Sequence, residues 1–137
     1  PRVDLITPNL PEAADLLGEA EITDIADMPA QAARLSGLGA KHVLLKGGHL
    51  AGDTSVDLLR TEGSVESVEA PRVETTDDHG TGCTLSAAIA ALRPQRSDWL
   101  QAVREGKEYL SGALGAAHRL DVGHGRGPVH HFHHWWD

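Results

Sequence analysis

Residues 77–83, Asp-Asp-His-Gly-Thr-Gly-Cys, put two carboxylates, a histidine, two glycines and the chain's only cysteine ahead of a run of small apolar residues. Glycines allow positive φ angles and let backbone N–H groups approach a ligand closely. At the start of a helix these N–H groups carry partial positive charge and can bind an anion. Gly80, Thr81 and Gly82 are therefore predicted to form an anion-binding turn.

Cys83 directly follows this turn. A thiol at the start of a helix has its thiolate favoured, so Cys83 could accept a proton from a substrate hydroxyl or act as a nucleophile. A glycine-rich connection with a small buried cysteine is the structural alternative. The motif is no Walker loop, because no Gly-Lys-Ser/Thr follows and Lys46 precedes its own glycines. A cysteine hydrolase using Cys83 and His79 is a weaker alternative, since no orienting partner is indicated.

The elements that must position these residues alternate between strand-like and helix-like patterns, which favours an α/β sheet over a helical bundle. Strands are predicted at residues 3–6 and 42–48, the second closed by two glycines. A hairpin pair is predicted at residues 54–61 and 64–73, with Pro71 ending or edging its second strand.

Four helices are predicted between and after these strands. The first is capped by Asn9, ends at Gly18 and carries Ala13, Leu16 and Leu17 on its apolar side. A second spans about residues 29–38, and a third follows Gly82. The third helix carries the apolar residues Leu85, Ala88, Ile89 and Leu92 at helical spacing. A last helix begins near Ser97 and carries the apolar residues Trp99, Val103, Leu110, Ala113 and Ala117.

The composition limits the classes of protein that fit. The 137 residues, 40% hydrophobic and 23% charged, are ordinary for one soluble globular domain. A net charge of −8 argues against a nucleic-acid or anionic-membrane surface. A single cysteine excludes an intrachain disulfide and suits the cytoplasm, and no apolar run approaches the roughly 18 residues of a spanning helix. The chain starts at Pro1 and reads like part of a longer protein.

Four segments carry a family resemblance, in the order TPNLPEA (7–13), VLLKGGH (43–49), HGTGCTLSAAIAA (79–91) and GHGRGPVHHF (123–132). Together they resemble the C-terminal half of bacterial hydroxymethylpyrimidine/phosphomethylpyrimidine kinase, a thiamine-biosynthesis enzyme of the ribokinase-like superfamily. The resemblance implies the C-terminal portion of a central, mostly parallel sheet flanked by helices. It also implies phosphoryl transfer from ATP, with Mg²⁺, to the hydroxymethyl group of 4-amino-5-hydroxymethyl-2-methylpyrimidine and then to its monophosphate.

The resemblance assigns roles to the residues around the turn. Gly80, Thr81 and Gly82 match the anion hole that receives the transferred phosphoryl group, and Cys83 matches the proposed base. In a loose transition state the nucleophile needs little deprotonation, so we expect the anion hole and nearby cations to matter more than the thiol. Lys107 matches a lysine near the phosphates, although a solvated helix face is an alternative reading.

The remaining roles fall near the start of the chain. Asn9 and Glu12 match an Asn-x-x-Glu element that organises Mg²⁺ and its waters; the same spacing also fits a capping box, and both roles can coexist. Lys46 matches a phosphate-binding lysine, where a surface lysine at a strand end is the alternative.

The histidine-rich end of the chain lacks the ligand spacing of structural zinc sites, so we interpret it as the family's C-terminal tail.

One departure from the family lies beside the expected anion hole. The usual Asn-Thr or Asp-Thr before His-Gly-Thr-Gly-Cys is here Asp77-Asp78, which adds a carboxylate where phosphate should bind. Like charge at this place should weaken ATP binding unless Mg²⁺ or a basic group offsets it.

The resemblance covers one half of the kinase, and the other half supplies the first strands of the sheet, the pyrimidine pocket and the lid. We therefore expect a single partial domain, residues 1–137, with an exposed strand edge and little activity without an N-terminal half. The expected partners are ATP and a small pyrimidine, with a homodimer in the complete family enzyme and with neither nucleic acid nor membrane. Pyridoxal/pyridoxine kinase, or a non-catalytic nucleotide-binding fragment or subunit, are the alternatives.

Overall fold

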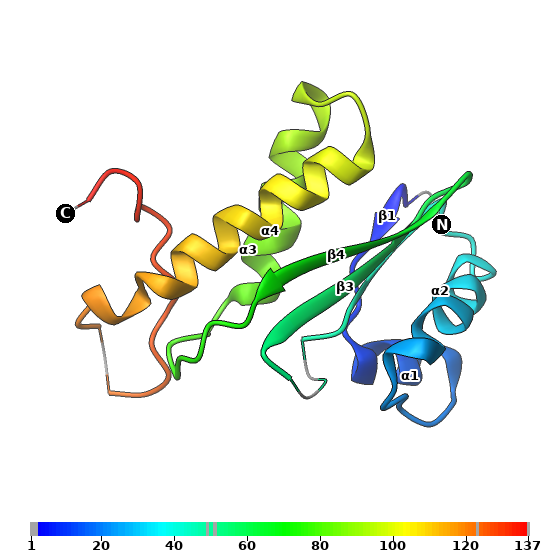
Figure 1. Ribbon diagram of the computed structural model, residues 1–137, viewed down its shortest axis with the longest axis horizontal. Coiled ribbons are helices and arrows are strands. Elements are labelled where there is room, and N and C mark those ends of the chain that lie inside the picture. Colours follow the sequence, from blue (N-terminus) through cyan, green and yellow to red (C-terminus); the bar gives the residue numbers. More distant parts are fainter. Residues whose placement is uncertain (1–2, 49, 51, 123, 137) are drawn as a thin grey trace. The chain divides into compact units, whose positions relative to one another are not determined.

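The structure, a computed structural model, describes residues 3–48, 50, 52–122 and 124–136 (Figure 1). It divides into two compact units, Pro1–Glu69 and Ala70–Asp137. His49 and Gly123, which belong to two of the segments that carry the family resemblance, lie outside the described residues. Among the described residues, no helix combines the length and apolar character needed to cross a bilayer.

The sheet has four strands in the order β1-β2-β3-β4. Their bounds are Leu5–Ile6 for β1, His42–Lys46 for β2, Thr54–Arg60 for β3 and Val65–Pro71 for β4. The first two strands are parallel, whereas β2 and β3 are antiparallel, with Lys46 opposite Asp57. The portion of the sheet in this chain is therefore mixed, and its short outer strand β1 pairs on one side only among the described residues. The predicted buried strand is β2, which ends at Lys46, directly before the two glycines that were predicted to close it.

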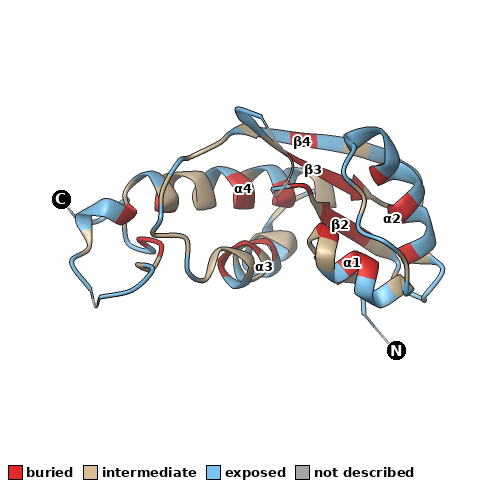
Figure 2. Cartoon of the chain, turned by 90° about the horizontal axis from the view of Figure 1, so that it is seen from below, coloured by how far each residue is buried: buried red, intermediate tan, exposed pale blue. Residues whose placement is uncertain are grey.

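Two helices of the first unit, α1 (Leu10–Leu17) and α2 (Met28–Ser36), pack against the sheet (Figure 1). The helix α1 begins at the predicted cap, Asn9, and ends at Gly18, whose φ of 66° suits a residue without a Cβ. Burial concentrates where the helices meet β2 and β3 (Figure 2). The apolar cluster there contains Leu10, Ala13, Met28, Ala32, Leu35, Val43, Leu45 and Leu58.

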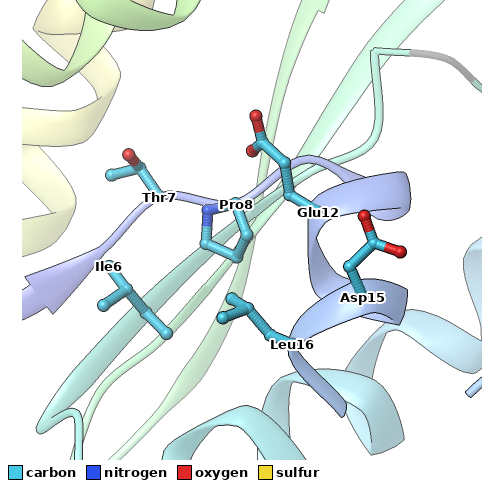
Figure 3. Close-up of a pocket in the computed structure, with 6 residues that line it drawn as sticks. All are labelled: Ile6, Thr7, Pro8, Glu12, Asp15 and Leu16. Carbon is cyan, nitrogen blue, oxygen red and sulfur yellow. The ribbon is translucent and has the colours of Figure 1, made fainter. Parts of the chain in front are cut away.

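The side chain of Leu16 departs from the sequence prediction. Its helical spacing put it with Ala13 on the apolar side of α1, but Leu16 is 56% exposed while Leu10 and Ala13 are fully buried. The buried face of α1 is centred on Leu10 and Ala13, which contact the sheet, and Leu16 lies around the helix from them, beside the end of β1 (Figure 3).

The second unit is built on two adjacent helices, α3 (Thr81–Leu92) and α4 (Trp99–Gly115) (Figure 1). Gly106 allows them to approach closely, because a Cβ at this position would lie 3.0 Å from Ile89 Cγ1. Asp98 caps α4 by accepting a hydrogen bond from the Gln101 N–H at 2.8 Å, close to the start predicted at Ser97.

Two details of these helices correct the sequence prediction. The helix α3 starts at Thr81, so that Thr81 and Gly82 lie in its first turn and not ahead of it. The helix α4 ends at Gly115, and Ala117 belongs to a separate 3-10 turn at Ala117–Arg119. All five Trp, Tyr and Phe residues of the chain belong to this unit: Trp99, Tyr109, Phe132, Trp135 and Trp136.

Candidate functional site

The glycine-rich turn at residues 80–83 opens directly into α3. Gly80 adopts φ 86°, a left-handed conformation that strains residues with a Cβ. The Thr81 N–H reaches the Asp78 carbonyl at 3.4 Å, and the Thr84 N–H donates to the Gly80 carbonyl at 2.9 Å. Within the described part of the chain, the N–H groups of Gly82 and Cys83 have no hydrogen-bond acceptor. Two backbone donors at a helix start are thus available to an anion.

Cys83 carries a free thiol that is exposed. This contradicts the alternative of a small buried cysteine, because the first turn of α3 turns this residue to its surface. In the described residues no hydrogen bond joins Cys83 to His79, the pair that a cysteine hydrolase would need. The His79 backbone is instead engaged by the tail, donating its N–H to the Gly127 carbonyl at 3.1 Å.

The carboxylates ahead of the turn are both engaged by the same tail. Arg126 Nη2 forms an ion pair with Asp78 Oδ2, and the Gly127 N–H donates to Asp77 Oδ1 at 3.2 Å. Sequence reasoning identified Asp78 as a problem for phosphate but did not identify Arg126 as its partner. The available signal was that Arg126 is the only permanently charged residue in the GHGRGPVHHF segment.

Three of the predicted residues meet in the first unit. Asn9 and Glu12 form a reciprocal capping box: Asn9 Oδ1 accepts from the Glu12 N–H at 2.8 Å, and Glu12 Oε2 accepts from the Asn9 N–H at 2.7 Å. The end of β2 lies beside them, because the Lys46 N–H donates to the Pro8 carbonyl at 2.9 Å. Lys46 Nζ lies 4.0 Å from Glu12 Oε2, and the lysine side chain is only 18% exposed.

A buried carboxylate stands next to this lysine and was not identified from the sequence. Asp57 lies opposite Lys46 across the β2 and β3 ladder, and the residue is 4% exposed. Its Oδ1 accepts a hydrogen bond from the Gly47 N–H at 3.1 Å. An acidic residue inside the apolar run Val56-Asp57-Leu58-Leu59 was the signal, since buried carboxylates occur where they have partners.

A shallow depression of about 520 Å³ lies where β1 passes into α1 (Figure 3). Its lining consists of Ile6, Thr7, Pro8, Glu12, Asp15 and Leu16. In Figure 3 the side chains of Ile6 and Leu16 extend toward one another beside Pro8, and the two carboxylates come from α1. Half of this lining is apolar, and Leu16 contributes the large exposed side chain described above.

Lys107 belongs to the second unit, which also contains the glycine-rich turn at residues 80–83. It lies on α4 and is 5% exposed, so the alternative of a lysine on a solvated helix face is wrong. The candidate residues therefore form one group in each unit. The first contains Asn9, Glu12 and Lys46, and the second contains Gly80, Thr81, Gly82, Cys83 and Lys107.

Comparison with known proteins identifies relatives of the whole chain. A family model described as phosphomethylpyrimidine kinase matches residues 1–130. The hydroxymethylpyrimidine/phosphomethylpyrimidine kinase of Escherichia coli strain K12 is 52% identical over 136 residues, which are 99% of this chain and 51% of that protein. The enzyme of that name from Salmonella typhimurium strain LT2 is 53% identical over 136 residues, with the same shares covered.

A solved structure gives the same picture of the fold. The pyridoxal kinase of Staphylococcus aureus, in complex with AMP-PCP and pyridoxal, matches with a TM-score of 0.89 and 30% identity, over 98% of this chain and 50% of that one. The ribokinase-like α/β fold expected from the sequence is thereby confirmed. The chain spans about half the length of the curated relatives it matches.

Proposed function

Because the chain belongs to the phosphomethylpyrimidine kinase family, we propose that it carries the nucleotide side of an ATP-dependent phosphoryl transfer in thiamine biosynthesis. The acceptor is the hydroxymethyl group of 4-amino-5-hydroxymethyl-2-methylpyrimidine, and then the phosphate of its monophosphate. The observation that carries the proposal is the pair of N–H groups, from Gly82 and Cys83, that lack an acceptor in the described residues.

In this proposal the turn and the lysines stabilise the negative charge of the phosphates. During transfer, a bond forms between the acceptor oxygen and the γ-phosphorus while the bond to the β,γ-bridging oxygen breaks, and negative charge spreads over the phosphoryl oxygens. The N–H groups of Gly82 and Cys83 donate to these oxygens, and Lys46 and Lys107 supply positive charge to the polyphosphate. The Cys83 sulfur accepts the proton that leaves the acceptor hydroxyl.

Glu12 and Asn9 are suited to hold Mg²⁺ through water. One carboxylate oxygen of Glu12 is occupied by the Asn9 N–H, and the side chain is still 56% exposed, so its other oxygen is open to an ordered water. Mg²⁺ usually keeps several waters and is bound by one or two carboxylates together with phosphate. When bound, the metal supplies charge neutralisation to the phosphates. Glu12 orients its water shell, and the capping box holds Glu12 in place.

The pyrimidine acceptor is preferred over a pyridoxal acceptor because the curated pyrimidine kinases are 52–53% identical to the chain. The alternative acceptor, pyridoxal or pyridoxine, is favoured by the 30% identical pyridoxal kinase, whose complex contains both pyridoxal and AMP-PCP. Competition between the two acceptors, measured with an N-terminal half supplied, separates them. The second alternative is a nucleotide-binding subunit without catalysis.

We further propose that an N-terminal half of the kinase pairs along β1. This two-residue strand is the outer strand of the sheet, and Ile6 and Leu16 present apolar surface beside it. In the same proposal the chain forms one partial domain of the kinase, the assembled enzyme is a homodimer, and it works in the cytoplasm.

The test is MgATP binding to the purified chain, measured by calorimetry. Gly82→Asp puts a carboxylate beside the two free N–H groups, and Lys46→Ala removes a cation. Both should weaken binding about tenfold or more, since removal of a single oxyanion-hole donor costs about 100-fold or more in rate. The folding of Gly82→Asp should be preserved, since an acidic residue is favourable in the first turn of a helix.

Matched controls make the same changes of charge elsewhere. Gly63→Asp lies in the exposed β3–β4 turn, where a Cβ has nothing within 4 Å, and Lys41→Ala removes a lysine whose side chain is 62% exposed. Both controls should bind MgATP like the unmodified chain. Binding that is absent from the folded chain, or that survives in Gly82→Asp, would contradict the proposed nucleotide site.

A further inference from the structure

A segment of the C-terminal tail runs beside the anion-binding turn. Hydrogen bonds join the His79 N–H to the Gly127 carbonyl at 3.1 Å and the Val129 N–H to the His79 carbonyl at 3.4 Å. These two bonds make a short parallel bridge immediately before Gly80. The tail is anchored further on, where the His130 N–H donates to a carbonyl of α4 at 3.0 Å.

Side chains strengthen this bridge on the acidic side of the turn. Asp77 Oδ1 accepts from the Gly127 N–H at 3.2 Å, and a Cβ at residue 127 would lie 2.5 Å from the same oxygen. A glycine is therefore needed for the tail to come this close. With the backbone of Gly127 held in this way, the preceding residue, Arg126, extends its guanidinium to the Asp78 carboxylate.

Asp78 is part of the turn itself, because its carbonyl accepts the Thr81 N–H. An unpaired carboxylate at this place would repel any anion that approaches the N–H groups of Gly82 and Cys83. We propose that Arg126 is a positioning residue that neutralises Asp78 and so keeps the turn open to phosphate. This inference rests on the proposed function for the nature of the anion, but the charge effect exists without it.

The expected size of the effect follows from the exposure of the pair. The Arg126 side chain is 71% exposed and that of Asp78 is 35% exposed, so solvent screens both charges. Removing Arg126 should lower the accessibility of the turn to anions by about threefold at low salt, and less at high salt. A contribution of this size is small for stability but measurable at the site.

The single thiol of the chain permits a test that needs no nucleotide. Iodoacetate and iodoacetamide both alkylate a thiolate by displacing iodide, but only iodoacetate is an anion. The ratio of their rate constants at Cys83 cancels changes in thiolate fraction and in exposure, and reports the local potential. Arg126→Ala should lower this ratio about threefold at low salt. Arg104→Ala, which removes an exposed arginine of α4, should leave it unchanged.

The decisive variant is the double substitution Asp78→Asn with Arg126→Ala. If Arg126 acts by neutralising Asp78, the rate ratio of the double variant should return to that of the unmodified chain. Arg126→Lys alone should keep a rate ratio close to that of the unmodified chain. If the double variant has a rate ratio as low as that of Arg126→Ala, Arg126 attracts the anion itself. If Arg126→Ala leaves the rate ratio unchanged, the ion pair has no role at the turn. Each of these results overturns the proposal. A restored ratio without MgATP binding would reject the proposed function alone.

Discussion

Gly47 directly follows Lys46 at the end of β2, and its backbone is enclosed. Its N–H donates both to the Val56 carbonyl at 3.0 Å and to the buried Asp57 carboxylate at 3.1 Å. A Cβ built at this position would meet the Val56 carbonyl oxygen well inside the 3.0 Å that real Cβ atoms keep, and the Met28 sulfur would lie 3.3 Å away. Gly47→Ala must therefore move backbone, since the nearest atom is a carbonyl oxygen.

The cost can be built from its parts. Overpacking a closed site costs about 1–3 kcal/mol. Weakening the shared hydrogen bond of the Gly47 N–H adds about 1 kcal/mol. The lower backbone entropy of alanine in the unfolded chain returns about 0.5 kcal/mol. The net expectation is a loss of about 1.5–3.5 kcal/mol in the free energy of unfolding, and a displaced Lys46.

Urea unfolding followed by far-UV circular dichroism measures this loss. Gly63→Ala is the matched control, because a Cβ there has nothing within 4 Å and should change stability by about 0.5 kcal/mol at most. The variant should also bind MgATP more weakly than the control when both are folded. A Gly47→Ala chain as stable as Gly63→Ala would refute the reasoning, because the contact with Val56 would then relax without cost.

Three further predictions concern groups outside the turn. Asn9→Ala removes the acceptor for the Glu12 N–H and should cost about 1 kcal/mol in urea unfolding. Side-chain hydrogen bonds from Arg96, at 2.5 and 2.6 Å, lower the pKa of Glu105. The unmodified chain should therefore be more stable than Glu105→Gln above about pH 4.5, and this difference in the free energy of unfolding should vanish as pH falls through the lowered pKa. Burial lowers the pKa of His133, so its NMR titration should have a midpoint below about 6.5, and its contribution should make the fold more stable as pH rises through that value.

Local signals in the sequence were sufficient to predict where an element begins or ends when its ends depend on nearby residues. Asn9 begins α1 and Gly18 ends it as predicted, because capping is decided within a few residues. The glycine-rich turn before α3 was predicted from its glycines, with only the first residue of α3 misplaced, and its binding of an anion stays a prediction. Leu16 was assigned to the core because periodicity identifies an apolar side but does not say how much of that side another element covers.

Contacts between distant residues could not be predicted in the same way. The ion pair of Asp78 with Arg126 joins residues 48 positions apart. The lone permanent charge of the tail segment marks Arg126 as a candidate for an ion pair, but it does not say which carboxylate is the partner. Asp57 was missed because its pairing with the Gly47 N–H depends on the register of β2 and β3. The burial of Lys107 likewise depends on packing around α4 that its own helical pattern does not reveal.

The distribution of aromatic residues has a practical consequence for following how this chain unfolds. Because every Trp, Tyr and Phe lies in Ala70–Asp137, near-ultraviolet absorbance and intrinsic fluorescence report on that unit alone. The aliphatic core around β2 contributes to the far-ultraviolet signal and is silent in emission. Two optical channels thus follow the two units without any label. Midpoints in urea that differ between the channels would show that the units do not unfold as one cooperative body.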